Sequence, residues 1–342
     1  MAEPSSSFCS AKFLVVICLI TAIPLALVIS LERRIKSEEG YGGSYEYYSN
    51  GWLRESCKWD DLNRRFLISS FDGGLSQILL PHDHNSGTVL LEEAVVHDDE
   101  VAGNATLGIV IDRSRNRLLV AIADVLGNRY GAVAAYDLTT WNRLFLTQLS
   151  GLPGDEKSFA DDVAVDSDGN AYITDAKNNK IWKVGVEGDL KYVIKSPLFH
   201  PKEWYKTFVG LNGIVYHPKG FLLVIHTFTG NLFKIDHLGD VKEEVQVKLV
   251  KLVGGGSLAL GDGMELMSPT KLVVAGSTPS GRLVESLDEW ETAKVVAKYS
   301  GPLHRLATGV TVKDGKPYLN HMFGLGLPRR KHVIVEAAFS PV

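Results

Sequence analysis

Short runs of alternating apolar and polar residues cover most of the chain from residue 53 onward, and Gly, Asp, Asn or Pro bounds each run. Alternation with a period of two predicts β-strands, and the bounding residues predict the turns between them. The stretch FADDVAVDSDGNAYITDAKNNKIWKV, residues 159–184, reads as strand, polar turn, strand, turn and strand. No helical pattern of convincing length interrupts these runs, so the body is expected to be all-β.

A similar unit recurs six times, at intervals of about 50 residues. The positions that anchor the six units are Cys57, Gly108, Val163, Gly213, Gly263 and Gly309. A period of this length with about four strands per unit predicts a six-bladed β-propeller over residues 53–340, whereas a β-sandwich or two smaller β domains would not explain it. The run HVIVEAAF at 332–339 is expected to pair with the first blade and close the ring, which removes exposed sheet edges.

An apolar segment precedes the repeats. Residues 13–31, FLVVICLITAIPLALVISL, carry no charge, and at about 1.5 Å per residue they nearly cross the hydrocarbon core of a bilayer. We expect an uncleaved transmembrane signal anchor after a short tail at 1–12, because the run is long for a cleaved signal peptide and no A-x-A site follows it. Residues 32–52 are expected to form a linker.

The composition excludes some classes of function. The chain of 342 residues has 45% hydrophobic and 22% charged residues, which is ordinary for a globular protein. Its net charge of −4 comes without a basic stripe, so nucleic-acid binding is not expected. Cys57 has no disulfide partner in the body and is expected to be a small buried residue.

The repeats resemble a known family. Residues 161–184 resemble an NHL repeat, whose pattern is V-x-D-x-x-G-N-x-Y-x-x-D followed by N-N and a basic residue. The whole body resembles the six-bladed propellers of the NHL and SMP-30/gluconolactonase kind, which are related in structure to strictosidine synthase-like proteins and paraoxonases. This resemblance implies a divalent cation, usually calcium, at the centre of the top face, held by residues at the starts of four inner strands.

The resemblance assigns four metal ligands, in the stretches ESCKW, DDV, NGI and DGM: Glu55, Asp161, Asn212 and Asp262. Their chemistry agrees, because a hard cation prefers carboxylate and amide oxygens. In a closed propeller the starts of the inner strands also converge on the axis. Asp162 is the substitute for Asp161 if the register shifts by one residue. Val163 replaces a glycine of the family and is expected to narrow the pocket.

Other polar side chains are interpreted as structural. Asp168 and Asp175 are expected to be turn residues, because Asp readily bonds its local backbone. His82 and His84 have a metal-like H-x-H spacing, but they lie in a polar loop between blades. His226 follows an apolar strand and is expected to be a buried structural histidine.

The resemblance implies a metal-dependent hydrolase of lactone or ester substrates, with Asp262 as ligand and candidate general base. Leu107 and Ala123 stand where paraoxonases have two histidines, so a dyad of that type is not expected. No G-x-S-x-G or H-E-x-x-H motif occurs. The alternative is a non-catalytic NHL-type propeller that binds a protein or glycan on its top face. A strictosidine synthase-like enzyme is less favoured, because the matching positions look like metal ligands.

The side of the membrane is open on the residues alone. The Lys and Arg residues that flank the apolar segment favour a cytoplasmic body, whereas the sequon Asn104-Ala105-Thr106 would be glycosylated only in the lumen. Mainly because of the family resemblance, we expect a single-pass protein of the secretory pathway with a lumenal or extracellular body.

Overall fold

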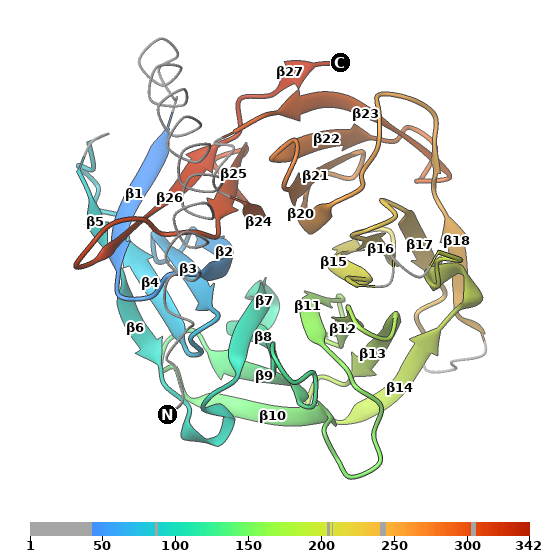
Figure 1. Cartoon of the computed structure of the whole chain (residues 1–342), viewed down its shortest axis with the longest axis horizontal. Coiled ribbons are helices and arrows are strands. Elements are labelled where there is room, and N and C mark those ends of the chain that lie inside the picture. The colour runs from blue at the N-terminus through green and yellow to red at the C-terminus, as the bar shows by residue number, and fades with distance from the viewer. Residues whose placement is uncertain (1–42, 86–87, 204–205, 207, 240–243, 302–305) are drawn as a thin grey trace, which may run out of the picture.

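The computed structural model describes residues 43–85, 88–203, 206, 208–239, 244–301 and 306–342. The strands of these residues form six sheets that follow one another around a central axis (Figure 1). The chain is a six-bladed β-propeller, and this part of the prediction is confirmed. The predicted anchor at 13–31 lies outside the described residues, and among those described no helix is long and apolar enough to cross a membrane.

The first three blades are four-stranded antiparallel meanders, each with its first strand nearest the axis (Figure 1). Blade 1 contains β2 (Arg54–Asp60), β3 (Arg65–Ser70), β4 (Leu75–Leu79) and β6 (Glu93–Val96). Blade 2 contains β7 (Ala105–Asp112), β8 (Arg117–Ala123), β9 (Gly131–Asp137) and β10 (Arg143–Ser150). Blade 3 contains β11 (Ala160–Val165), β12 (Ala171–Asp175), β13 (Lys180–Val184) and β14 (Leu190–Lys195).

Blade 4 is also four-stranded, whereas blades 5 and 6 have additional strands at their outer edges. Blade 4 contains β15 (Leu211–His217), β16 (Phe221–His226), β17 (Leu232–Asp236) and β18 (Gln246–Leu249). Blade 5 contains β20 (Gly261–Ser268), β21 (Lys271–Gly276), β22 (Gly281–Glu285) and β23 (Thr292–Tyr299), with β19 (Lys251–Leu252) and β27 (Ser340–Pro341) paired to β23. Short 3-10 turns occur at η1 (Asp99–Val101), η2 (Arg113–Arg115) and η3 (Pro197–Phe199).

Blade 6 closes the ring by combining β1, the first described strand, with three strands from the C-terminal part of the chain. It contains β24 (Ala307–Lys313), β25 (Lys316–His321) and β26 (Arg330–Glu336), joined by β1 (Ser44–Ser49) and β5 (Leu90–Leu91). β1 pairs antiparallel with β26, from Ser44 opposite Val335 to Ser49 opposite Arg330. The expectation that 332–339 pairs with the first blade is therefore wrong, and β1 lies within the range expected to be a linker. Alternation predicts a strand but does not name its partner.

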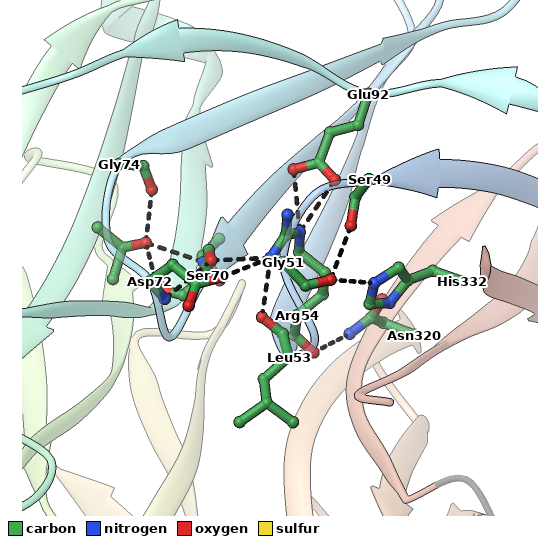
Figure 2. Close-up of polar contacts among 12 residues, drawn as sticks. Ser49, Gly51, Leu53, Arg54, Ser70, Asp72, Gly74, Glu92, Asn320 and His332 are labelled. Carbon is green, nitrogen blue, oxygen red and sulfur yellow. Dashed lines mark hydrogen bonds and ion pairs between the residues drawn. The ribbon is translucent and has the colours of Figure 1, made fainter. Parts of the chain in front are cut away.

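A buried arginine reinforces this closure (Figure 2). Arg54, at the start of β2, donates from Nε to both carboxylate oxygens of Glu92 at 2.9 and 3.0 Å. Its Nη1 donates to Ser70 Oγ at 2.9 Å and to the carbonyl oxygen of Leu53 at 3.0 Å. Glu92 directly follows β5, so the contact joins blade 1 to the edge of blade 6.

The core lies between neighbouring blades rather than inside one sheet. The second strand of blade 2, β8, is buried along its whole length, because its alternate residues face blade 1 and blade 3. Such strands are apolar on both faces and read as continuous hydrophobic runs. Packing on both sides holds the inner strands in place at the axis.

Candidate functional site

A break in strand pairing recurs near the start of every inner strand. The pairing with the second strand of the blade shifts at Arg54/Cys57, Thr106/Ile109, Ala160/Val163, Leu211/Ile214, Gly261/Met264 and Ala307/Gly309. Such a β-bulge takes a residue out of the ladder and re-aims its side chain. The residues that open the six bulges, which we call the axial ring, are Glu55, Leu107, Asp161, Asn212, Asp262 and Thr308.

Close approach of neighbouring inner strands explains the residue that follows the ring in four blades. A Cβ atom on Gly213 would lie 2.3 Å from the carbonyl oxygen of Asp262, and one on Gly263 would lie 2.5 Å from that of Thr308. A side chain would not fit between these backbones, so glycine is required there. Gly108 and Gly309 follow the ring residue in the same way in blades 2 and 6.

Blades 1 and 3 have Ser56 and Asp162 in place of that glycine, and hydroxyl groups of the second strands support their bulges. Ser69 Oγ accepts from the backbone N–H of Ser56 at 3.0 Å, and Thr174 Oγ1 accepts from that of Asp162 at 3.0 Å. Val163, expected to replace the glycine and narrow the pocket, instead pairs in the regular ladder and packs between blades 2 and 3. That assignment was wrong by one residue, because alternation alone does not locate a bulge.

The two adjacent acids of blade 3 have separate environments. Asp162 accepts from the backbone N–H of Val163 at 2.8 Å and from that of Ile214 at 3.2 Å, so it bridges blades 3 and 4. Burial raises the pKa of Asp162 to about 6, although the charge of Lys58 and these hydrogen bonds act in the opposite direction. Asp161 opens the bulge of blade 3 and is its ring residue, and Asp162 takes the position that glycine has in four other blades.

Three carboxylates of the axial ring influence one another. Glu55 and Asp161 are only 7% and 6% exposed. Burial raises the pKa of both well above the usual range, and the charge of Asp262 raises both further. Burial and the charge of Asp162 raise the pKa of Asp262 to about 7, partly offset by a hydrogen bond from the Asn212 side chain. The structure therefore places the four predicted residues around the same end of the axis.

The axial ring has the chemistry of a cation site without being a compact cluster. Among the described residues, no group of three or more His, Cys, Asp or Glu side chains is gathered closely enough to hold a metal ion. Glu55 Oε2 is buried, however, and finds no hydrogen-bond partner in the described part of the chain. A buried carboxylate oxygen without a partner is costly. Carboxylate and amide oxygens are the ligands that a hard cation accepts, so these residues fit calcium.

Blade 6 holds the backbone of Glu55 in position. Asn320 Nδ2 donates to the carbonyl oxygen of Arg54 at 2.9 Å (Figure 2). The same nitrogen donates to the carbonyl oxygen of Glu55 at 3.1 Å. The hydroxyl group of Thr308, itself a ring residue, also donates to the Glu55 carbonyl oxygen. Closure of the propeller therefore sets the place of the first predicted ligand.

A partly buried ion pair lies just beyond the axial ring along the inner strands of blades 1 and 5. Lys58 and Glu265 each follow a ring residue, Glu55 or Asp262, by three positions. Lys58 Nζ forms an ion pair with Glu265 and donates to the carbonyl oxygen of Val310 at 3.1 Å. Burial alone would lower the pKa of Lys58, but Glu265 outweighs it and the pKa is raised. The sequence interpretation missed both residues, although a charged residue within an apolar inner strand could have indicated a partly buried ion pair.

Lys58→Met is expected to lower the free energy of unfolding by about 2 kcal/mol. The side chains are 15% and 30% exposed, so the cost falls between that of a surface pair and that of a fully buried one. Urea denaturation would measure it, and the double variant Lys58→Met/Glu265→Leu should recover part of the loss. Equal stability of Lys58→Met and the native chain would show that the pair contributes nothing.

The side chains interpreted as structural have structural contacts. Asp175 accepts hydrogen bonds from the backbone N–H groups of Lys177 and Asn178 in the turn that follows β12, and from that of Phe159 just before β11. The turn before β12 is capped by Asp166, which accepts from the backbone N–H of Asp168 at 3.0 Å, so Asp168 itself is not the capping residue. His226 Nδ1 accepts from the backbone N–H of Thr229 at 3.4 Å, and burial lowers its pKa to about 4. That histidine is therefore neutral at physiological pH.

The remaining candidates are not residues of the axial ring. Cys57 is fully buried, and burial raises the pKa of its thiol to about 12, so it is not a nucleophile. His82 and His84 lie between β4 and β5, and the His84 ring packs against Tyr45 of β1. Asn104 is half-buried and donates to a backbone carbonyl oxygen, while the hydroxyl group of Thr106 is buried. Glycosylation at Asn104 stays a prediction.

Comparison with known proteins shows the architecture alone. No protein-family model matches the chain, and no curated protein matches it. Among solved structures, a luciferin-regenerating enzyme aligns with a TM-score of 0.54 and 11% identity over 88% of this chain and 98% of that chain. A glucose dehydrogenase aligns with a TM-score of 0.54 and 14% identity over 87% and 100%. A streptogramin B lyase aligns with a TM-score of 0.51 and 11% identity over 87% and 99%. The fold is shared. At these identities the activity does not follow from it.

Proposed function

We propose that this chain is a calcium-dependent hydrolase of lactone or ester substrates, and that the axial ring is its active site. The observation that carries the proposal is the buried Glu55 Oε2, which has no partner in the described chain and sits near two further ring acids. Glu55, Asp161, Asn212 and Asp262 would supply the oxygen ligands. The predicted membrane anchor at 13–31 would hold this site near a bilayer.

In this proposal the ring residues have two different roles, cation binding and proton acceptance. A divalent cation, when bound, would polarise a substrate carbonyl group and lower the pKa of a water molecule. Glu55 and Asp161 are almost wholly buried, so their part is to hold the cation. Asp262 is the ring carboxylate that keeps partial access to solvent. We therefore assign to Asp262 the acceptance of the proton from the attacking water.

Calcium titration of the full-length chain tests the site. Calorimetry should show binding to the native chain, and at least a tenfold loss of affinity in Glu55→Gln and in Asp161→Asn, which keep the size of the side chain. Asp189→Asn is the matched control, because Asp189 is an exposed acid of blade 3 paired with Lys191 at 2.6 Å. A folded native chain that binds no calcium at millimolar concentration would contradict the proposal.

One observation favours a non-catalytic binding module as the second candidate. The acids of the axial ring do not form a compact metal-binding group within the described residues. A panel of lactones, assayed with and without a chelator, separates the two candidates. Turnover that the chelator abolishes supports the hydrolase. Calcium binding without turnover of any lactone or ester supports a propeller that binds a protein or glycan on this face.

A further inference from the structure

Two cations lie on the face of blade 5 that packs against blade 4. Arg282 of β22 and Lys298 of β23 are directly opposite each other in the antiparallel ladder, so their side chains point to the same face of the sheet. Val284, two positions after Arg282 on β22, shares that face and belongs to the core cluster between blades 4 and 5. Like charges placed directly opposite each other destabilise a sheet.

Arg282 lacks a counter-charge. It is 1% exposed, and its Nη2 donates to the carbonyl oxygens of Ala259 at 2.8 Å and Thr278 at 3.0 Å. Its Nε and Nη1 are buried and have no hydrogen-bond partner in the described chain. Burial lowers the pKa of Arg282 to about 10, and no acid acts in the opposite direction. Glu285, the only acid in β21, β22 and β23, is paired across the ladder with Lys294. Buried charges in proteins are normally paired.

A glycine loop lies next to both cations. Residues 253–260 run from β19, at the outer edge of blade 5, to β20 near the axis. The three glycines at 254–256 have positive φ angles of 152°, 79° and 110°. A Cβ atom on Gly255 would lie 1.8 Å from the carbonyl oxygen of Val295. Glycine is therefore required where the loop lies against β23.

The glycine loop meets Lys298 at Gly256. A Cβ atom on Gly256 would lie 3.1 Å from Lys298 Nζ. Within the described part of the chain, Lys298 forms no ion pair, and the backbone N–H groups of Gly255, Gly256 and Ser257 donate no hydrogen bond. Successive N–H groups of a glycine-rich loop, next to a lysine and an arginine, are the donors that bind an oxyanion.

We propose that the glycine loop, Lys298 and Arg282 form a binding site for phosphate, either free or as the phosphoryl group of a larger ligand. Lys298 and the loop contact the phosphate, and Arg282 supplies charge from the buried side. A phosphoryl group has several acceptor oxygens and close to two negative charges near neutral pH, so it matches these donors and compensates both cations.

This site is separate from the axial ring. β23 lies three strands away from β20, which carries the ring residue Asp262, and neighbouring strands are about 4.8 Å apart. Phosphate binding therefore does not depend on the proposed hydrolase activity, and it can be measured without calcium.

Calorimetry with sodium phosphate, in excess chelator, tests the proposal. The native full-length chain should bind one phosphate at millimolar or lower concentration, and Lys298→Gln should weaken binding roughly tenfold. Lys271→Gln is the matched control and should bind as the native chain does, because Lys271 is a 46% exposed lysine at the far end of β21. An unchanged affinity in Lys298→Gln, or no binding by the folded native chain, would overturn the proposal.

Melting temperatures separate specific binding from screening of charge. Sodium phosphate should raise the melting temperature of the native chain by about 2 °C more than sodium chloride at equal ionic strength. Arg282→Met should lose this difference, and Lys298→Gln decides the same comparison if Arg282→Met does not fold. Equal stabilisation of the native chain by the two salts would count against a phosphate site.

A titration with O-phospho-L-serine identifies the source of the phosphate. Tighter binding of phosphoserine than of inorganic phosphate would assign the site to a phosphorylated ligand, and equal or weaker binding would assign it to the free anion. Both results support the site. Because calcium is absent from these titrations, they remain informative even if the axial ring proves to have no hydrolase activity.

Discussion

Asp262→Asn is expected to lower kcat/KM for lactone hydrolysis by roughly 100- to 10,000-fold and, at the same time, to stabilise the calcium-free protein at pH 8. The first effect follows from loss of a ligand and a proton acceptor at the axial ring. The second follows from the environment of this carboxyl group, whose pKa burial and Asp162 raise from 3.8 to about 7.

The sign of the stability effect follows from proton binding. Between pH 4 and pH 7 the folded chain holds a proton on Asp262 that the unfolded chain has released. The free energy of unfolding therefore falls as pH rises through this range and stays low above it. An asparagine carries no charge and avoids this loss, while its amide oxygen can still accept from Gly263 N–H. With the group partly exposed, we expect a gain on the order of 2–4 kcal/mol at pH 8.

Urea denaturation in excess chelator at pH 5 and pH 8 checks this expectation. The native chain should be less stable at pH 8, Asp262→Asn should show a smaller difference between the two pH values, and Asp189→Asn should behave as the native chain does. Addition of calcium should stabilise the native chain more than Asp262→Asn. Equal stability of the calcium-free native chain at both pH values would contradict the prediction, because it would show that ionisation of the ring carboxylates does not lower the free energy of unfolding.

Arg54→Met is expected to lower the free energy of unfolding by about 3–5 kcal/mol. The side chains of Arg54 and Glu92 are 6% and 5% exposed, so the variant leaves a carboxylate buried without its partner. It also removes the contact that joins the start of β2 to the strand edge of blade 6. Urea denaturation and thermal unfolding of the full-length chain would measure the loss.

A double variant separates the lost pair from a general disruption of packing. In Arg54→Met/Glu92→Leu the unpaired carboxylate is gone, and most of the stability should return. Lys219→Met is the control for loss of an exposed pair, because the Lys219 and Glu289 side chains are 56% and 62% exposed, and it should cost less than about 1 kcal/mol. A double variant as unstable as Arg54→Met would show that Arg54 acts by packing instead.

Most residues of the axial ring could be predicted from the sequence, but the bulges that position them could not. The family resemblance assigned Glu55, Asp161, Asn212 and Asp262 as ligands, and the structure places all four in the axial ring. The sequence interpretation was wrong about the position that follows the ring residue in blade 3. It assigned Val163 to this position, which is glycine in four blades, whereas Asp162 occupies it in the structure. A bulge adds one residue to a strand without disturbing the apolar pattern on either side, so its location is set by pairing with the next strand.

Lys58, Glu265 and Leu107 show what the sequence left out. Lys58 and Glu265 lie in different blades, and nothing in their local stretches indicates that they pair. Leu107 was noted only as a missing histidine, yet it is a buried residue of the axial ring that packs with Ala105 and Ala123. Contacts between residues so far apart in the chain depend on how the blades pack together.

By itself, the sequence determined that this protein is a propeller of six blades, because the period of about 50 residues and the alternation within each unit are local properties that need no partner. Only the tertiary structure decided how the ring closes, with β1 joining β26, and where the bulge falls in each inner strand. Both depend on hydrogen bonds between strands. A local pattern predicts that a strand forms, but only the packed structure shows its partner and register.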